Sequence, residues 1–162
     1  MQSRIRNPLM IVPGAFEAMR TLGEVTIEGG SIPRRTLELT HLRASQINGC
    51  AVCMHYHVHE LREAGETEER IIAVPAWRDT PFFSEAERAA LALTEAATRL
   101  SDRADAVPDE IWNEAARHYD ERALAQLVLS IATINAWNRV NVITRQIAGS
   151  WAAVDSGAAA AA

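Results

Sequence analysis

Apolar residues recur at helical spacing through almost the whole chain, and this periodicity constrains the fold more than any other feature. After Pro13-Gly14, apolar side chains return at Phe16, Met19 and Leu22, as one face of an amphipathic helix requires. No stretch shows the alternation of apolar and polar residues that indicates a half-buried strand. The sequence therefore predicts an all-α fold.

Helix-starting residues divide the chain into about six or seven helices. Pro33 and Pro108 suit the first turn of a helix. Ser84 with Glu87 forms a capping-box pattern, and Asp120 suits the N-cap of the last long helix. We therefore expect a helical bundle.

The length of 162 residues fits one domain with its own core. We expect this domain to span residues 1–156. The alanine-rich tail at residues 157–162 is expected to be disordered, because six residues cannot offset the cost of helix nucleation.

Charge and hydropathy narrow the range of partners and compartments. The net charge is −5 and no Lys/Arg run occurs, so nucleic acid is not expected as a partner. The most apolar run, residues 123–134, is too short to span a membrane, and the first eight residues lack a signal-peptide core. We expect a cytoplasmic protein. Because that compartment keeps thiols reduced, two cysteines three residues apart are expected to serve catalysis or metal binding.

The two cysteines, Cys50 and Cys53, open a predicted helix that runs to about Ala64 and closes at Gly65. At 100° per residue, the cysteines lie about 60° apart around the helix, and Cys53 and His57 about 40° apart. All three side chains therefore share one face.

The Asn48-Gly49 break places Cys50 at or near the helix N-terminus. Unpaired backbone N–H groups and the helix dipole favour a thiolate there, and the thiolate is the reactive form of cysteine. His57, one turn after Cys53, suits the role of a base or proton carrier. In such a pair, one thiol can capture the oxidised other as a disulfide.

Two other interpretations of this helix stay open. The cysteines can pack as small apolar residues in an inert core. Alternatively, Cys50, Cys53 and His57 can be three zinc ligands, with His41 or Glu38 as the fourth. Structural zinc sites usually draw ligands from two separated pairs, and the sequence offers no second Cys/His pair.

Polar residues outside this helix suggest packing roles. Asn135, Asn138 and Asn141 make the middle of the last helix polar, which predicts hydrogen-bonded packing or a subunit contact. His41 follows Glu38 by one turn, and either lines the site or has a packing or surface role.

The segment from Glu38 to His57, with LRASQINGC at residues 42–50, resembles the AhpD-like alkylhydroperoxidase branch of the carboxymuconolactone decarboxylase family. Some members place a further His between the two cysteines, where this chain has Ala51 and Val52. The similarity covers most of the chain and continues into Trp77-Arg78, residues 83–91 and residues 135–139.

This resemblance implies an all-α fold around a helical hairpin, assembly into trimers or hexamers, and reduction of hydroperoxides without metal, haem or other cofactor. Cys53 matches the peroxidatic cysteine, which becomes a sulfenic acid, and Cys50 matches the resolving cysteine. His57 and Glu38 match the proton relay that activates Cys53. A small dithiol or a dithiol protein is then the expected reductant.

Three functions remain in competition. The first is a thiol-dependent peroxidase in antioxidant defence. The second is the lactone decarboxylase of the family's name, and the third is a non-enzymatic redox sensor or oligomeric scaffold. Decarboxylation needs proton transfer and oxyanion stabilisation, not two thiols, so the cysteine pair favours the peroxidase.

Overall fold

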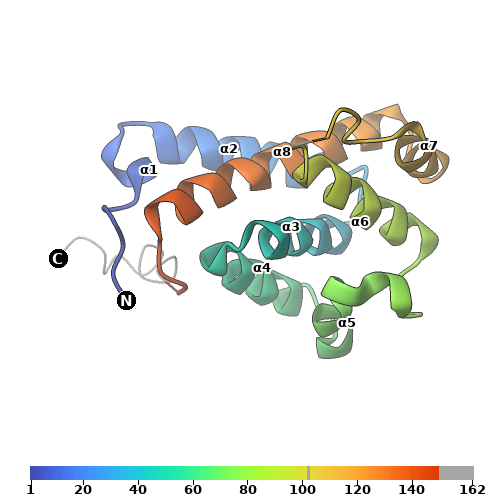
Figure 1. Cartoon of the computed structure of the whole chain (residues 1–162), viewed down its shortest axis with the longest axis horizontal. Helices are drawn as coiled ribbons and strands as arrows, with labels where there is room; N and C mark the ends of the chain where they lie inside the picture. The colour runs from blue at the N-terminus through green and yellow to red at the C-terminus, as the bar shows by residue number, and fades with distance from the viewer. Residues whose placement is uncertain (102, 150–162) are drawn as a thin grey trace.

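The computed structural model describes residues 1–101 and 103–149, and every regular element in these ranges is a helix (Figure 1). The tail at residues 157–162 and the end of the predicted domain lie outside the described residues. The elements are α1 (Pro8–Ile11), α2 (Ala15–Glu28), α3 (Arg34–Asn48), α4 (Ala51–Glu63), α5 (Glu68–Ala73), the 3-10 helix η1 (Val74–Asp79), α6 (Glu85–Thr98), α7 (Asp109–His118) and α8 (Glu121–Thr144).

The all-α prediction is confirmed, and the described residues contain two short elements, α1 and η1, that the sequence does not predict. The four-residue helix α1 starts at Asn7, whose side chain accepts a hydrogen bond from the Leu9 backbone N–H. One turn is too short for apolar periodicity to reveal it. The second element is the six-residue 3-10 helix η1, Val74–Asp79.

Helix starts were the most predictable local feature, because the capping side chains act on their own first turn. The Ser84–Glu87 capping box forms in both directions, and Asp120 accepts a hydrogen bond from the Ala123 backbone N–H at 2.8 Å.

Helix α3 lies in the middle of the molecule, with α8 along one side and α4 along the other, and α6 also packs against it (Figure 1). Its apolar residues Leu37, Leu39 and Leu42 are buried in the core. Because α3 is covered on several sides, its polar residues Glu38 and His41 are buried too. Buried polar groups need hydrogen-bond partners, so Glu38 and His41 are expected to contact other polar side chains.

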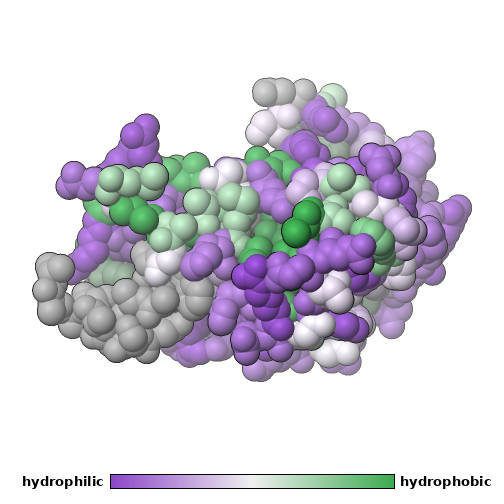
Figure 2. Space-filling model, turned by 90° about the horizontal axis from the view of Figure 1, so that it is seen from below, coloured by the Kyte–Doolittle hydropathy of each residue, from purple (hydrophilic) through white to green (hydrophobic). Residues whose placement is uncertain are grey.

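Figure 2 shows a face that is mainly hydrophilic and is interrupted by apolar patches, the most apolar of them near its middle. In the part of the chain that the structure describes, no helix is both long and apolar enough to cross a bilayer.

Candidate active site

Cys50 and Cys53 lie at the start of α4, as the sequence predicts. Gly49 ends α3 in the left-handed conformation (φ 68°), and Cys50 then occupies the N-cap position of α4. The two sulfurs form a disulfide between Cα atoms 5.4 Å apart. Both cysteines are buried and belong to a small apolar cluster with Ala44 and Ile134. The fold thus holds the two thiols within bonding reach at a helix N-terminus.

Each sulfur accepts one hydrogen bond. The Cys53 backbone N–H donates to Cys50 Sγ at 3.3 Å, and the Asn141 side-chain amide donates to Cys53 Sγ at 3.4 Å. Donors of this kind stabilise a thiolate more than a thiol. The sequence marks Asn141 only as part of a polar stretch, and nothing local connects it to a cysteine 88 residues away.

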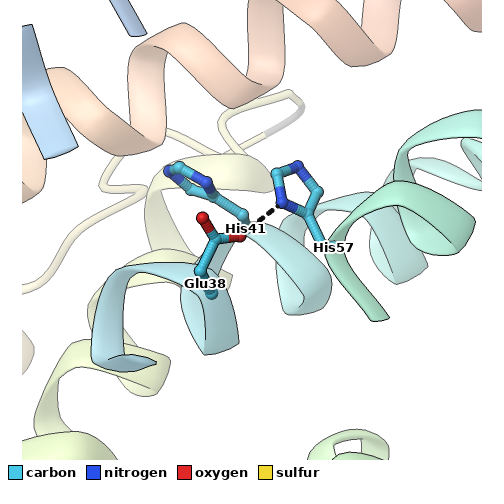
Figure 3. A group of neighbouring side chains, drawn as sticks. All are labelled: Glu38, His41 and His57. Carbon is cyan, nitrogen blue, oxygen red and sulfur yellow. Dashed lines mark hydrogen bonds and ion pairs between the residues drawn. The ribbon is translucent and has the colours of Figure 1, made fainter. Parts of the chain in front are cut away.

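Glu38 and His57 form the second half of the site, from facing positions on α3 and α4 (Figure 3). His57 Nδ1 donates to Glu38 Oε2 at 2.7 Å, and both side chains are buried. The proximity expected from the helical hairpin is therefore observed. Burial acts to raise the pKa of Glu38, but the hydrogen bond from His57 and the Arg34 guanidinium, whose Nε lies 3.8 Å from Glu38 Oε1, help to outweigh it, and that pKa is lowered. Glu38 is therefore a carboxylate at neutral pH.

His41 is a buried neighbour of this pair, which rules out the surface role left open by the sequence. Its ring lies 4.9 Å from the His57 ring, centroid to centroid. His41 Nε2 is 2.6 Å from Ser130 Oγ, whereas Nδ1 has no hydrogen-bond partner within the described residues. Burial and the nearby His57 lower the pKa of His41 to about 4, so this imidazole is neutral at pH 7. The spacing of three residues from Glu38 was the signal that could have placed it here.

Glu38, His41 and His57 are also the candidate metal ligands of the site. One ligand atom from each lies within 4.8 Å of the others. Two imidazoles and a carboxylate suit a first-row transition metal. His57 Nδ1 and Glu38 Oε2 are hydrogen-bonded to each other, so a metal bound through these two atoms would have to replace that hydrogen bond. The zinc set considered from the sequence also needs both cysteines, which here are bonded to each other.

A buried amide network fixes the last turn of α3 against α8. Asn48 Nδ2 donates to Asn135 Oδ1 at 2.9 Å and to Asn138 Oδ1 at 2.8 Å. Asn138 Nδ2 in turn donates to Ser45 Oγ at 3.1 Å. The predicted hydrogen-bonded packing of α8 is therefore observed, and it holds the helix break before the cysteines in place.

Comparison with known proteins identifies the family. The sequence model of the carboxymuconolactone decarboxylase family matches residues 13–96, just over half of the chain. The chain belongs to the carboxymuconolactone decarboxylase family. The matched range contains Glu38, Cys50, Cys53 and His57, and it ends before α8 and Asn141.

Curated relatives from the bacteria Bacillus subtilis and Escherichia coli are both uncharacterised. YdfG of B. subtilis is 41% identical over 132 residues, which cover 82% of this chain and 88% of YdfG. YnjA of E. coli is 32% identical over 103 residues, which cover 64% of this chain and 55% of YnjA.

Solved structures show that this family member has an AhpD-like fold. ATU0492 from Agrobacterium tumefaciens, a protein of unknown function described in connection with the antioxidant defence protein AhpD, matches with a TM-score of 0.84 and 33% identity, over 91% of this chain and 98% of that one. The debrominase Bmp8 matches with a TM-score of 0.74 and 25% identity, over 84% of this chain and 72% of that one.

Proposed function

We propose that this chain is a thiol-dependent peroxidase that reduces organic hydroperoxides. The observation that carries the proposal is the disulfide-forming Cys50–Cys53 couple at the start of α4, together with the buried carboxylate–imidazole pair that joins α3 to the same helix. Dithiols supply the two electrons that the reduction of an O–O bond requires, and an imidazole one turn away can move the proton. The description of ATU0492 in terms of antioxidant defence is in keeping with this role.

The cycle starts from the reduced pair. The Cys53 thiolate attacks the terminal oxygen of ROOH, the O–O bond breaks, and the departing alkoxide takes a proton from His57 to leave as ROH. Cys53 is then a sulfenic acid. The Cys50 thiol attacks its sulfur, the S–O bond breaks, water leaves, and the Cys50–Cys53 disulfide forms. A small dithiol or a dithiol protein returns the pair to the reduced state by thiol–disulfide exchange.

Asn141, Glu38 and His41 have different roles in this cycle. Asn141 stabilises negative charge on Cys53 by its hydrogen bond to the sulfur. Glu38 orients His57 and holds the proton on Nδ1, which leaves Nε2 to exchange protons with the reaction. His41 stays neutral and therefore does not compete with His57 for the charge of Glu38.

The test is a thiol count on the reduced protein before and after one equivalent of cumene hydroperoxide. Wild type should lose two thiols per chain and regain them with a dithiol. Cys50→Ser should react once and stop at a sulfenic acid, and Cys53→Ser should not react. Reaction of Cys53→Ser, with Cys50→Ser inert, would reverse the two roles. Repeated turnover with the dithiol distinguishes an enzyme from a redox sensor.

A second candidate is reductive debromination of an aromatic ring, favoured by the structural similarity to the debrominase Bmp8. The same dithiol can supply the electrons, because an aryl bromide and two thiols give the arene, hydrogen bromide and a disulfide. Bromide release from 2,3,4-tribromopyrrole by the reduced protein tests this candidate. Lactone decarboxylation is the third, and its activity should survive in both cysteine variants.

A further inference from the structure

A small hollow opens beside the disulfide, between the start of α4 and the end of α8. Its volume is about 290 Å³, at the small end of the roughly 300–1,000 Å³ typical of ligand sites. Residues 49–52 line one wall, and Asn141, Val142, Arg145 and Gln146 line the other. A molecule in this hollow therefore lies next to Cys50 and to the amide that contacts Cys53.

Arg145 gives the hollow its charge. Among the described residues that line it, Arg145 carries the only ionised side chain, because both cysteines are in the disulfide and no carboxylate is present. Arg145 is exposed to solvent. A positive group without a lining counter-charge favours an anionic occupant.

The backbone at Arg145 argues that its side chain has a role of its own. Arg145 closes α8 in the left-handed conformation (φ 54°, ψ 46°), and it is the one non-glycine residue with positive φ in the described ranges. Glycines stand at the left-handed positions that follow α3 and α4, namely Gly49 and Gly65. Glycine or asparagine would satisfy the same geometry at the end of α8 with less strain. An arginine that adopts this conformation beside a reactive pair points to recognition of a ligand by its side chain.

We propose that Arg145 binds the carboxylate of a small organic substrate whose reacting group then faces the disulfide-forming cysteines. The planar guanidinium matches a carboxylate with two parallel hydrogen bonds, which fixes orientation as well as position. The expected substrates are small hydroperoxides that carry a carboxylate. This substrate class rests on the proposed function, because it assumes that the same site reduces hydroperoxides.

Binding to the disulfide form tests the anion site without any turnover. The probes are 4-isopropylbenzoate and, as its neutral counterpart, 4-isopropylbenzyl alcohol, followed by NMR titration. Wild type should prefer the acid, and Arg145→Asn should weaken binding of the acid about tenfold, the loss of one charge-assisted hydrogen-bonded pair. Asparagine tolerates the left-handed conformation, so the variant should keep its thermal midpoint.

Two further variants sharpen the result. Arg145→Lys keeps the charge but loses the two parallel hydrogen bonds, so it should retain only part of the preference for the acid. Arg117→Asn changes an exposed arginine on α7 and should bind as wild type does. Equal affinity of wild type for acid and alcohol, or an Arg145→Asn variant that binds the acid as tightly as wild type, overturns the inference.

Oxidation kinetics separate this inference from the proposed function. The reduced protein is mixed with cumene hydroperoxide or with its ring-carboxylated analogue. The ratio of the two rate constants should favour the carboxylated peroxide in wild type and fall about tenfold in Arg145→Asn. If the acid probe binds through Arg145 but neither peroxide oxidises the thiols, the anion site stands and the peroxidase proposal fails.

Discussion

Glu38 keeps its negative charge inside the protein because interactions with His57 and Arg34 offset its burial. Replacement by the isosteric but neutral glutamine, Glu38→Gln, should therefore leave the packing intact and remove the charge that orients His57. We expect oxidation of Cys53 by cumene hydroperoxide to slow by about 10²-fold, the typical share of positioned acid–base catalysis. Stopped-flow measurement on the reduced protein gives the rate.

The matched control for this prediction is Glu63→Gln, an exposed carboxylate at the end of α4. It should oxidise at the wild-type rate. A Glu38→Gln variant as fast as Glu63→Gln would exclude Glu38 from the mechanism, whatever its hydrogen bond.

We expect the stability of the protein to depend on the protonation of His41, because its pKa of about 4 in the folded state lies below the ordinary value of 6.5. Between pH 6.5 and pH 4, the unfolded chain binds a proton at this position and the folded chain does not. The free energy of unfolding must therefore fall as the pH falls through this window, by up to about 3 kcal/mol. Glu38 adds to acid sensitivity from about pH 4.5 downward, at the lower end of this window and below it, because its folded pKa is lowered from 4.5.

Urea unfolding of wild type and His41→Gln at pH 7, 5.5 and 4.5 isolates the contribution of His41. Glutamine keeps a hydrogen-bonding group for Ser130, and the difference between the two proteins cancels titrations that they share. The wild-type curve should drop more steeply with falling pH. Parallel curves would mean that His41 has the same proton affinity in both states.

At the level of helices, the sequence could predict whatever depends on neighbours along the chain. The Asn48-Gly49 break and the apolar periodicity place Cys50 at the start of α4, and a short connection makes α3 and α4 antiparallel neighbours, which brings Glu38 to His57. Helix α1 was not predicted, because a helix of one turn is too short to show apolar periodicity.

Contributions from α8 could not be predicted in the same way. Asn141 reaches Cys53 only because α8 packs along α3 and α4, and the register of that packing depends on long-range contacts that no local pattern encodes. The same holds for the left-handed Arg145 beside Cys50, since nothing in the sequence around residue 145 requires that conformation. The site is therefore a local motif completed by a distant helix.

The whole molecule has a second hollow, at the end opposite the cysteines. It has a volume of about 520 Å³ and lies between α7 and α8, where Trp112 and Val128 line it with exposed apolar surface. Val128 and Val142 are separated by roughly 20 Å along α8. The hollow that Val128 lines is therefore remote from the one that Val142 and Cys50 line. Exposed apolar patches of this kind are typical of protein contacts. We propose that a second copy of the chain covers it in a homo-oligomer, the trimer or hexamer that the family resemblance implies.

Light scattering coupled to size-exclusion chromatography tests this assembly. Wild type should elute with three or six times the chain mass of 17.8 kDa. Val128→Lys places a charge where the partner would bury an apolar side chain, and burial of an unpaired charge costs several kcal/mol, so its mass should fall. Ile72→Lys is the control, because Ile72 is a more exposed apolar residue on α5, outside the hollow. This variant should keep the wild-type mass.

A wild-type mass of one chain would refute the assembly. A Val128→Lys variant with the wild-type mass would instead move the interface away from α7 and α8, because a buried lysine at that position could not be accommodated without loss of affinity.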